Sequence, residues 1–86
     1  VLDSQQNIFF TDGNRIRKIE RTTNIISTFG GLGTAGFSGD GGIVALAEFN
    51  TPVGLQFDSS FQNLLVVDGL NQRTRRISLL NFAIRT

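Results

Sequence analysis

The sequence predicts an all-β protein that is built from two copies of one multi-stranded unit. Apolar residues come in short runs rather than at helical spacing, and such runs are typical of strands that are buried on both faces. These runs begin at Ile8, Ile25, Leu64 and Phe82. The second observation is a repeat, because one pattern of strand and turn residues occurs twice within the 86 residues. Repeats of this kind are typical of solenoids, propellers and arrays.

Three matched blocks carry the repeat. In the central block, Asn7 corresponds to Asn63. Compared with the separation of the two central blocks, the two upstream blocks are separated by one residue fewer and the two downstream blocks by two residues more. The copies therefore differ only by small shifts in their turns. The matched blocks are residues 2–4 with 57–59, residues 7–13 with 63–69, and residues 15–19 with 73–77.

The first unit contains three predicted strands and a fragment of an opening strand. Asp12-Gly13, followed by Asn14, separates two of these strands, and an Asp-Gly pair between strand-like runs strongly indicates a hairpin. We therefore expect two antiparallel strands to be joined there. The predicted segments are residues 1–3, 8–11, 15–20 and 25–29.

The second unit contains four predicted strands. Its first strand alternates, with Val53, Leu55 and Phe57 on one side, so one face of it meets a core. Four short antiparallel strands that are buried on both sides describe a blade of a β-propeller. The sequence therefore predicts a β-propeller fragment of two four-stranded antiparallel blades, the first of which lacks most of its opening strand. The predicted strands are residues 53–58, 64–67, 73–78 and 82–86.

The chain divides into three segments. Residues 1–29 are the first blade, residues 30–50 are a Gly-rich connection between blades, and residues 51–86 are the second blade. The connection is much longer than a usual connection of about 2 to 6 residues, and long connections tend to be functional or disordered. Within it, residues 43–49 are expected to form a helical turn that tucks Leu46 and Phe49 against the blades.

The residues of both blades resemble a known family. The segments FTDGNRIRKI and VVDGLNQRTRRI, with TPVGLQFD before the second and ISTFGGLGTAGFSGDGG between them, are similar to NHL repeats. The resemblance covers essentially the whole chain. It implies a propeller of about six blades, which serves mainly as a rigid platform for protein, RNA or carbohydrate partners. The chain departs from the family pattern in its shortened turn at Asp12-Gly13-Asn14 and at Thr74, where the family prefers a large aliphatic residue.

The composition lacks the commonest catalytic and metal-binding groups. The chain has no cysteine, histidine or tyrosine, which removes thiolate and imidazole ligands and the usual nucleophile and base partners. The Gly-rich stretch from Gly36 to Gly42 lacks the lysine and helix of a phosphate loop and the clustered carboxylates of a calcium loop. We therefore predict no catalytic residue, no metal site and no cofactor, and hence a protein that is not an enzyme.

Two Asp-Gly pairs occupy the same place in both copies, each at the end of an apolar strand. Asp12 with Gly13 and Asp68 with Gly69 are assigned a structural role in their turns, in which the carboxylate accepts backbone N–H groups. Repetition in each blade favours a structural device over a single active site.

Basic residues gather in and beside the third strand of each blade. A cluster of this kind is compatible with phosphate contacts, so an RNA-binding propeller surface is an alternative. Against it, the net charge is only +1, and no Tyr, Trp or His provides a stacking platform. The structural interpretation is that long arginine stems cover apolar surface and pair with nearby acids. The basic residues concerned are Arg15, Arg17, Lys18, Arg21, Arg73, Arg75 and Arg76.

The turn between the second and third strands of each blade should share one end of the blade with the long connection. We predict that this rim contacts any partner first. The sequence thus predicts a non-catalytic scaffold or protein-interaction module within a larger NHL-type propeller, and part of a propeller hydrolase or lyase with its active site in other blades is a further alternative. The expected partners are other blades, which come from the same chain or from self-association, and a protein of unknown identity. No membrane partner is expected, and the sequence does not indicate a compartment. The candidate rim residues are Asn14, Arg15, Phe37, Asp40, Asn71 and Arg73.

Overall fold

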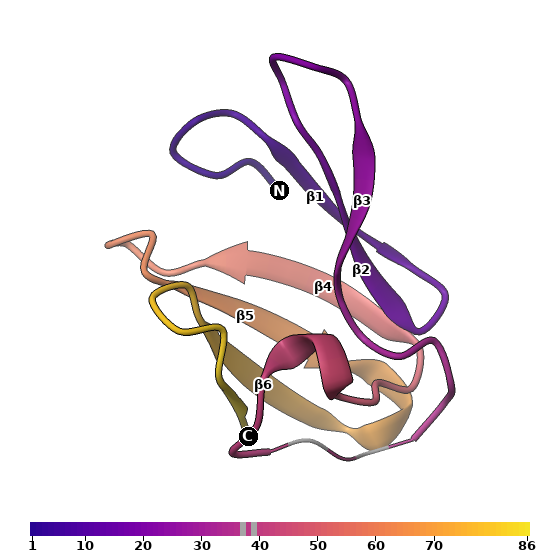
Figure 1. Cartoon of the computed structure of the whole chain (residues 1–86). Helices are drawn as coiled ribbons and strands as arrows, with labels where there is room; N and C mark the ends of the chain where they lie inside the picture. The colour runs from indigo at the N-terminus through magenta and orange to yellow at the C-terminus, as the bar shows by residue number, and fades with distance from the viewer. Residues whose placement is uncertain (37, 39) are drawn as a thin grey trace.

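The computed structural model describes residues 1–36, 38 and 40–86, and it is all-β, as the sequence predicts (Figure 1). The chain forms two antiparallel sheets, with the strand orders β1-β2-β3 and β4-β5-β6-β7. Within the described residues, neither sheet closes on itself. The strands are β1 (Ile8–Asp12), β2 (Arg15–Ile19), β3 (Ile26–Gly30), β4 (Pro52–Phe57), β5 (Asn63–Asp68), β6 (Arg73–Ser78) and β7 (Ile84–Arg85).

The predicted hairpin lies between β1 and β2. Asp12 pairs with Arg15, so Gly13 and Asn14 form the loop. Gly13 has a φ of +60°, a backbone region that glycine adopts without steric cost. The corresponding turn of the second sheet contains a short 3-10 helix, η2 (Gly69–Asn71), which ends at Gln72 in the left-handed region. The second copy therefore accommodates the two additional residues of its turn in a 3-10 helix.

Two of the predicted strands differ from the observed ones by more than one residue at an end. The opening strand of the first unit is reduced to an isolated bridge between Leu2 and Ile8. The last strand was predicted over residues 82–86, but β7 contains only Ile84 and Arg85. Phe82 belongs instead to the preceding turn, because its φ is +59° and its N–H donates to the Ser78 carbonyl.

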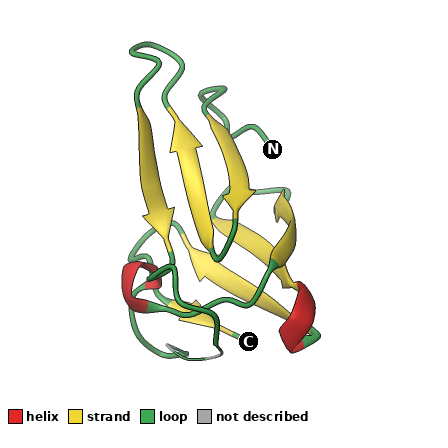
Figure 2. Cartoon of the chain, turned by 90° about the vertical axis from the view of Figure 1, so that its right-hand side faces the viewer, coloured by secondary structure: helices red, strands yellow, loops and turns green. Residues whose placement is uncertain are grey.

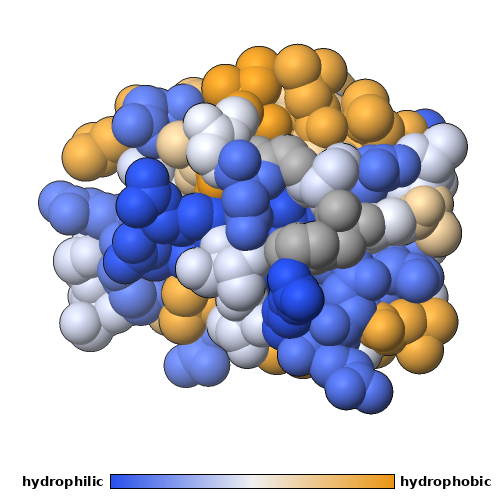
Figure 3. Space-filling model, turned by 90° about the horizontal axis from the view of Figure 1, so that it is seen from below, coloured by the Kyte–Doolittle hydropathy of each residue, from blue (hydrophilic) through white to orange (hydrophobic). Residues whose placement is uncertain are grey.

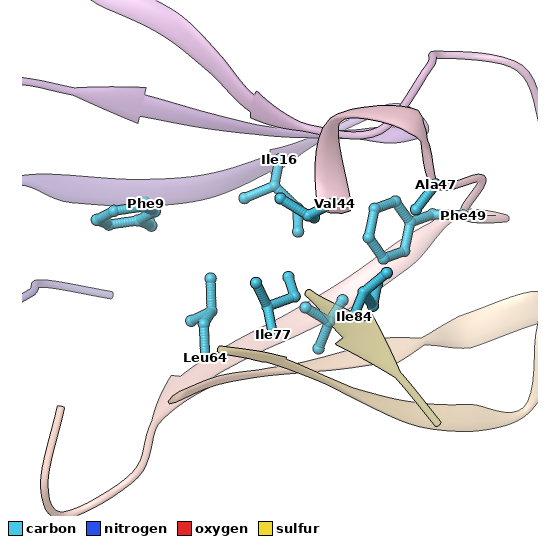
Figure 4. Packing of buried hydrophobic residues seen from close by; sticks show 9 residues of the cluster. Phe9, Ile16, Val44, Ala47, Phe49, Leu64, Ile77 and Ile84 are labelled. Carbon is cyan, nitrogen blue, oxygen red and sulfur yellow. The ribbon is translucent and has the colours of Figure 1, made fainter. Parts of the chain in front are cut away.

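The hydrophobic core lies between the two sheets. Phe9 and Ile16 of the first sheet face Leu64, Ile77 and Ile84 of the second (Figure 4), and all of these side chains are buried. Full burial of one such side chain contributes about 1.5–3 kcal/mol. Figure 2 shows that the strands of the two sheets cross at an angle rather than lie parallel. The core is thus formed by packing one unit on the other.

The connection between the sheets completes this core. It contains a 3-10 helix, η1 (Val44–Leu46). Val44 of this helix, the capping residue Ala47 and Phe49 are buried. Phe49 was expected to pack inward, but the same expectation for Leu46 is wrong, since Leu46 is 62% exposed. A 3-10 helix places residues three apart on one face, so Val44 and Ala47 point inward and Leu46 points outward.

The repeat is visible in matching hydrogen bonds at the start of β1 and β5. The Asp3 carboxylate accepts hydrogen bonds from the backbone N–H and the side chain of Asn7, at 2.9 and 3.0 Å. The Asp58 carboxylate accepts the same pair of bonds from Asn63, at 3.3 and 2.8 Å. In both units, therefore, the same pair of hydrogen bonds from an Asn to an Asp carboxylate closes the turn before the strand, β1 in the first unit and β5 in the second. We call this pair of hydrogen bonds the Asp–Asn clamp.

Candidate functional site

The candidate site is the end of the molecule at which the two predicted turns meet the connection. We call this the connection end and define it as residues 12–15, the described residues between 31 and 50, and residues 68–73. In Figure 1 the turns at residues 12–15 and 68–73 lie on the right and lower right, and the connection begins and ends beside them, whereas the turns at residues 3–7 and 58–63 lie at the opposite end. Residues 41–44 of the connection lie beside β7, where the Gly41 N–H donates to the Ile84 carbonyl. Figure 3, which views the molecule from below, shows a largely hydrophilic face with apolar patches at its margins.

The first turn is attached to the connection by two side chains. The Asn14 amide accepts a hydrogen bond from the Thr51 N–H at 2.9 Å and donates one to the Gly33 carbonyl at 3.4 Å. The Arg15 guanidinium donates to the Leu32 carbonyl at 3.2 Å. A Cβ atom at Gly33 would lie 2.4 Å from this guanidinium, so glycine permits the contact. Asn14 and Arg15 thus position the connection.

The second turn is attached through a buried carboxylate. Asp68 is fully buried and accepts hydrogen bonds from the Asn50 N–H at 2.7 Å and from the Asn71 side chain at 2.6 Å. Asn71 also donates to the Gly36 carbonyl at 2.8 Å. The Asp68 carboxylate therefore joins the end of the connection, at Asn50, to the second turn, at Asn71.

The site contains a second fully buried charge, Arg75, which the sequence indicated only as one of the basic residues expected to pair with nearby acids. Arg75 is fully buried and donates to the carbonyls of Glu48 and Ser38, at 2.6 and 2.7 Å. It also forms ion pairs with Asp40 at 2.9 Å and with Asp68 at 3.8 Å. The signal was the strand alternation, because Arg75 lies on the same side of β6 as the buried Ile77.

The acidic groups of this end act as hydrogen-bond acceptors. Thr34 and Ser38 donate to Glu48 and lower the pKa of this carboxyl. Burial raises the pKa of Asp40, but hydrogen bonds from Thr86 and Arg75 outweigh this effect and lower it. Both groups therefore stay ionised at neutral pH, which suits structural ion pairing and does not match a general acid near its titration range.

The predicted site residues fall into distinct roles. Asn14, Arg15 and Asn71 meet at the connection end, as described above, and Asp40 pairs with the buried Arg75. Arg73 begins β6, is exposed and pairs across the ladder with Asp68. Phe37 lies outside the described residues. The structure thus brings five of the six candidates to one end and uses several of them to hold the connection in place.

The carboxylates of the two Asp-Gly pairs have different partners: Asp68 contacts its own turn through the Asn71 side chain, as the predicted structural role requires, whereas Asp12 contacts Arg17. Asp12 is exposed and forms an ion pair with Arg17 at 3.5 Å. Asp68 accepts a backbone N–H from outside its turn, that of Asn50. The physical reason is burial, since a buried carboxylate needs several donors, which the connection supplies to Asp68. Gly69 is also confined, because a Cβ atom there would lie 2.7 Å from the Thr51 carbonyl oxygen.

A cavity of about 420 Å³ lies between β3, η1 and the β6–β7 turn. Phe29, Val44 and Phe82 supply much of its apolar wall, and among the described residues Lys18 is the one charged side chain that lines it. In the part of the chain that the structure describes, no three acidic side chains gather to hold a metal ion. The same part contains no helix that is long and apolar enough to cross a membrane.

Comparison with known proteins adds no relative. No protein-family model, curated protein or solved structure matches the chain.

Proposed function

We propose that the chain is part of a repeat protein of the β-propeller type and acts as a non-catalytic platform that binds a protein partner at its connection end. The single observation that carries the proposal is the equivalence of the two units. They share the Asp–Asn clamps at Asp3 and Asp58, and they pack face to face through Phe9 and Leu64. Stacked β units of this kind form rigid supports whose loops present the binding surface.

The rigidity of the connection end supports the choice of this surface. A long loop gains affinity for a partner when it is already held in one conformation before binding. Here Asn14, Asn71 and Arg75 hold the connection through hydrogen bonds to Gly33, Gly36 and Ser38. Arg15 and Arg73 remain exposed at its borders, and exposed arginines on a rigid surface are frequent anchors in protein interfaces.

Binding of RNA is the alternative that the arginines suggest. The connection end also carries the carboxylates of Asp12, Asp40 and Glu48, which oppose a polyanion. A mixed-charge surface fits a protein partner better than a phosphate backbone.

The proposal is tested by affinity capture from cell extract with three forms of the chain. The first is the wild type, the second carries Arg15→Glu and Arg73→Glu at the connection end, and the third carries Gln5→Glu and Gln62→Glu at the opposite end. We expect proteins captured by the wild type to be lost with the second form and kept with the third, while all three forms still melt in one cooperative transition. Capture that is abolished by ribonuclease, or that is lost with the third form only, would overturn the assignment.

A further inference from the structure

Arg17 and Arg75 occupy the same position in the two units. The matched blocks 15–19 and 73–77 align them, and each pairs with a residue of the neighbouring strand, Phe10 or Val66. Each also forms an ion pair with the aspartate that ends that strand, at 3.5 Å for Arg17 and Asp12 and at 3.8 Å for Arg75 and Asp68. The two arginines are thus the same structural device.

Their surroundings differ. The side chain of Arg75 is 0% exposed, and the connection covers it with the carbonyls of Ser38 and Glu48 and the carboxylate of Asp40. The side chain of Arg17 is 29% exposed. Among the described residues, its guanidinium has one hydrogen bond, to Asp12. In the first unit, therefore, the aspartate is present and the covering connection is not.

The apolar residues around the two arginines show the same difference. In the second sheet, a cross-strand row of Leu64, Ile77 and Ile84 is fully buried under the first sheet. In the first sheet, the corresponding row is Ile8, Ile19 and Ile26. Ile8 is 43% exposed and Ile26 is 51% exposed. We call the side of the first sheet that carries this isoleucine row and Arg17 its outward face.

The second sheet has the complementary surface. Leu65 and Thr74 correspond in the repeat to Phe9 and Ile16, which cover the row of the second sheet. Leu65, Val67 and Thr74 line a cavity of about 200 Å³ on the side of the second sheet that points away from the core. Each sheet thus has one face of each kind. Within the chain, the face of the first sheet that carries Phe9 and Ile16 packs on the isoleucine–leucine row of the second sheet, whereas the outward face of the first sheet and the Leu65–Thr74 face of the second sheet are left uncovered among the described residues.

We propose that the outward face of the first sheet binds a further unit of the same build, whose Gly-rich connection lies over Arg17. The incoming unit supplies an apolar sheet face to Ile8, Ile19 and Ile26, and its connection supplies backbone carbonyls and one carboxylate to the guanidinium. Arg17 is then the anchor that selects this partner, because a planar guanidinium with several donors matches carbonyl and carboxylate acceptors held at fixed positions. This inference rests on the proposed repeat platform and names the partner of one of its faces.

A tandem chain tests the inference. Because Ile84 corresponds to Ile26 and Leu2 to Phe57, the tandem consists of residues 1–86, followed by a copy of residues 29–56 and then by a copy of residues 2–86. Arg17 of the second copy then lies where a unit and its connection precede it, and Arg17 of the first copy does not. The two positions provide a matched pair within one molecule.

We expect the tandem to melt in one transition at a higher temperature than the single chain. Arg17→Ala in the second copy should lower that melting temperature by as many degrees as Arg75→Ala in the same copy does. Arg17→Ala in the first copy should change it little. Equal effects of Arg17→Ala in the two copies would overturn the inference and leave the repeat platform standing. A tandem that melts no higher than the single chain would overturn both.

Discussion

The two units of this protein start from nearly the same residues and differ in what covers them. Asp68 and Arg75 of the second unit are fully buried, whereas the corresponding Asp12 and Arg17 of the first unit form an ion pair in contact with solvent. The difference lies in the neighbour, because the first sheet and the connection pack on the second sheet and nothing described packs on the outward face of the first. In this chain, therefore, the charged pair is buried in the unit that the other sheet and the connection cover, and it is exposed in the other unit.

The buried arginine gives the largest expected difference between the units. Arg75→Ala should lower the free energy of unfolding by about 3–5 kcal/mol, because it removes the cation beside the buried Asp68. Arg17→Ala removes an exposed pair and should cost about 1 kcal/mol or less. Urea denaturation of both variants measures the difference. Equal losses would mean that the buried network contributes no more than a surface ion pair.

The aspartates form the second matched pair. Asp68→Ala should cost about 2 kcal/mol, because the Asn50 N–H and the Asn71 amide each lose an acceptor in the interior. Asp12→Ala should change the free energy of unfolding by less than about 0.5 kcal/mol, as is usual at exposed positions. Thermal denaturation followed by circular dichroism compares the two. A larger loss for Asp12→Ala would contradict the assigned burial.

The Asp–Asn clamps are the same in both units, so their contributions to the free energy of unfolding should change with pH in the same direction. The Asn63 side chain is the main reason why the pKa of Asp58 is lowered to about 2, and hydrogen bonds from Asn7 outweigh burial to lower the pKa of Asp3. A carboxyl with a lowered pKa stabilises the fold above its unfolded pKa of about 3.9 and loses this effect as pH falls toward its folded pKa.

We therefore expect Asp58→Asn to melt below the wild type by a constant interval from pH 7 to about pH 5, and the interval to shrink between about pH 4 and pH 2. Asp3→Asn should follow the same course. Melting curves recorded across this pH range measure both intervals. An interval that widens on acidification would show that these carboxylates are not stabilised in their ionised form.

Much of the fold could be predicted because its signals are local. The Asp12-Gly13 pair specifies its hairpin, and the short apolar runs place most strands within one or two residues of their observed bounds. The buried network of Arg75 could not be predicted in the same way, because its partners Ser38, Asp40 and Glu48 are distant in sequence. The position of Arg75 in the alternation of β6 indicates an inward side chain, but it does not identify the acceptors.

The candidate site shows the same limit. The topology of antiparallel strands correctly places residues 12–15 and residues 68–73 beside the connection. It does not show that the side-chain amides of Asn14 and Asn71 donate hydrogen bonds to the carbonyls of Gly33 and Gly36, because such bonds depend on the path of a loop that has no periodic pattern. Helix type matters in the same way, since the 3-10 geometry of η1 buries Val44 rather than Leu46.

The most direct test is the mass of the 86-residue chain by light scattering over a range of concentrations. Because each sheet leaves one apolar face uncovered, we expect the mass to rise with concentration above the 9.4 kDa of one chain, as exposed apolar patches promote association. Ile26→Lys and Val67→Lys, one on each uncovered face, should reduce this association, whereas Leu80→Lys, at an exposed turn, should not. A cooperatively folded wild-type monomer of 9.4 kDa at every concentration, or an equal effect of Leu80→Lys, would contradict the account.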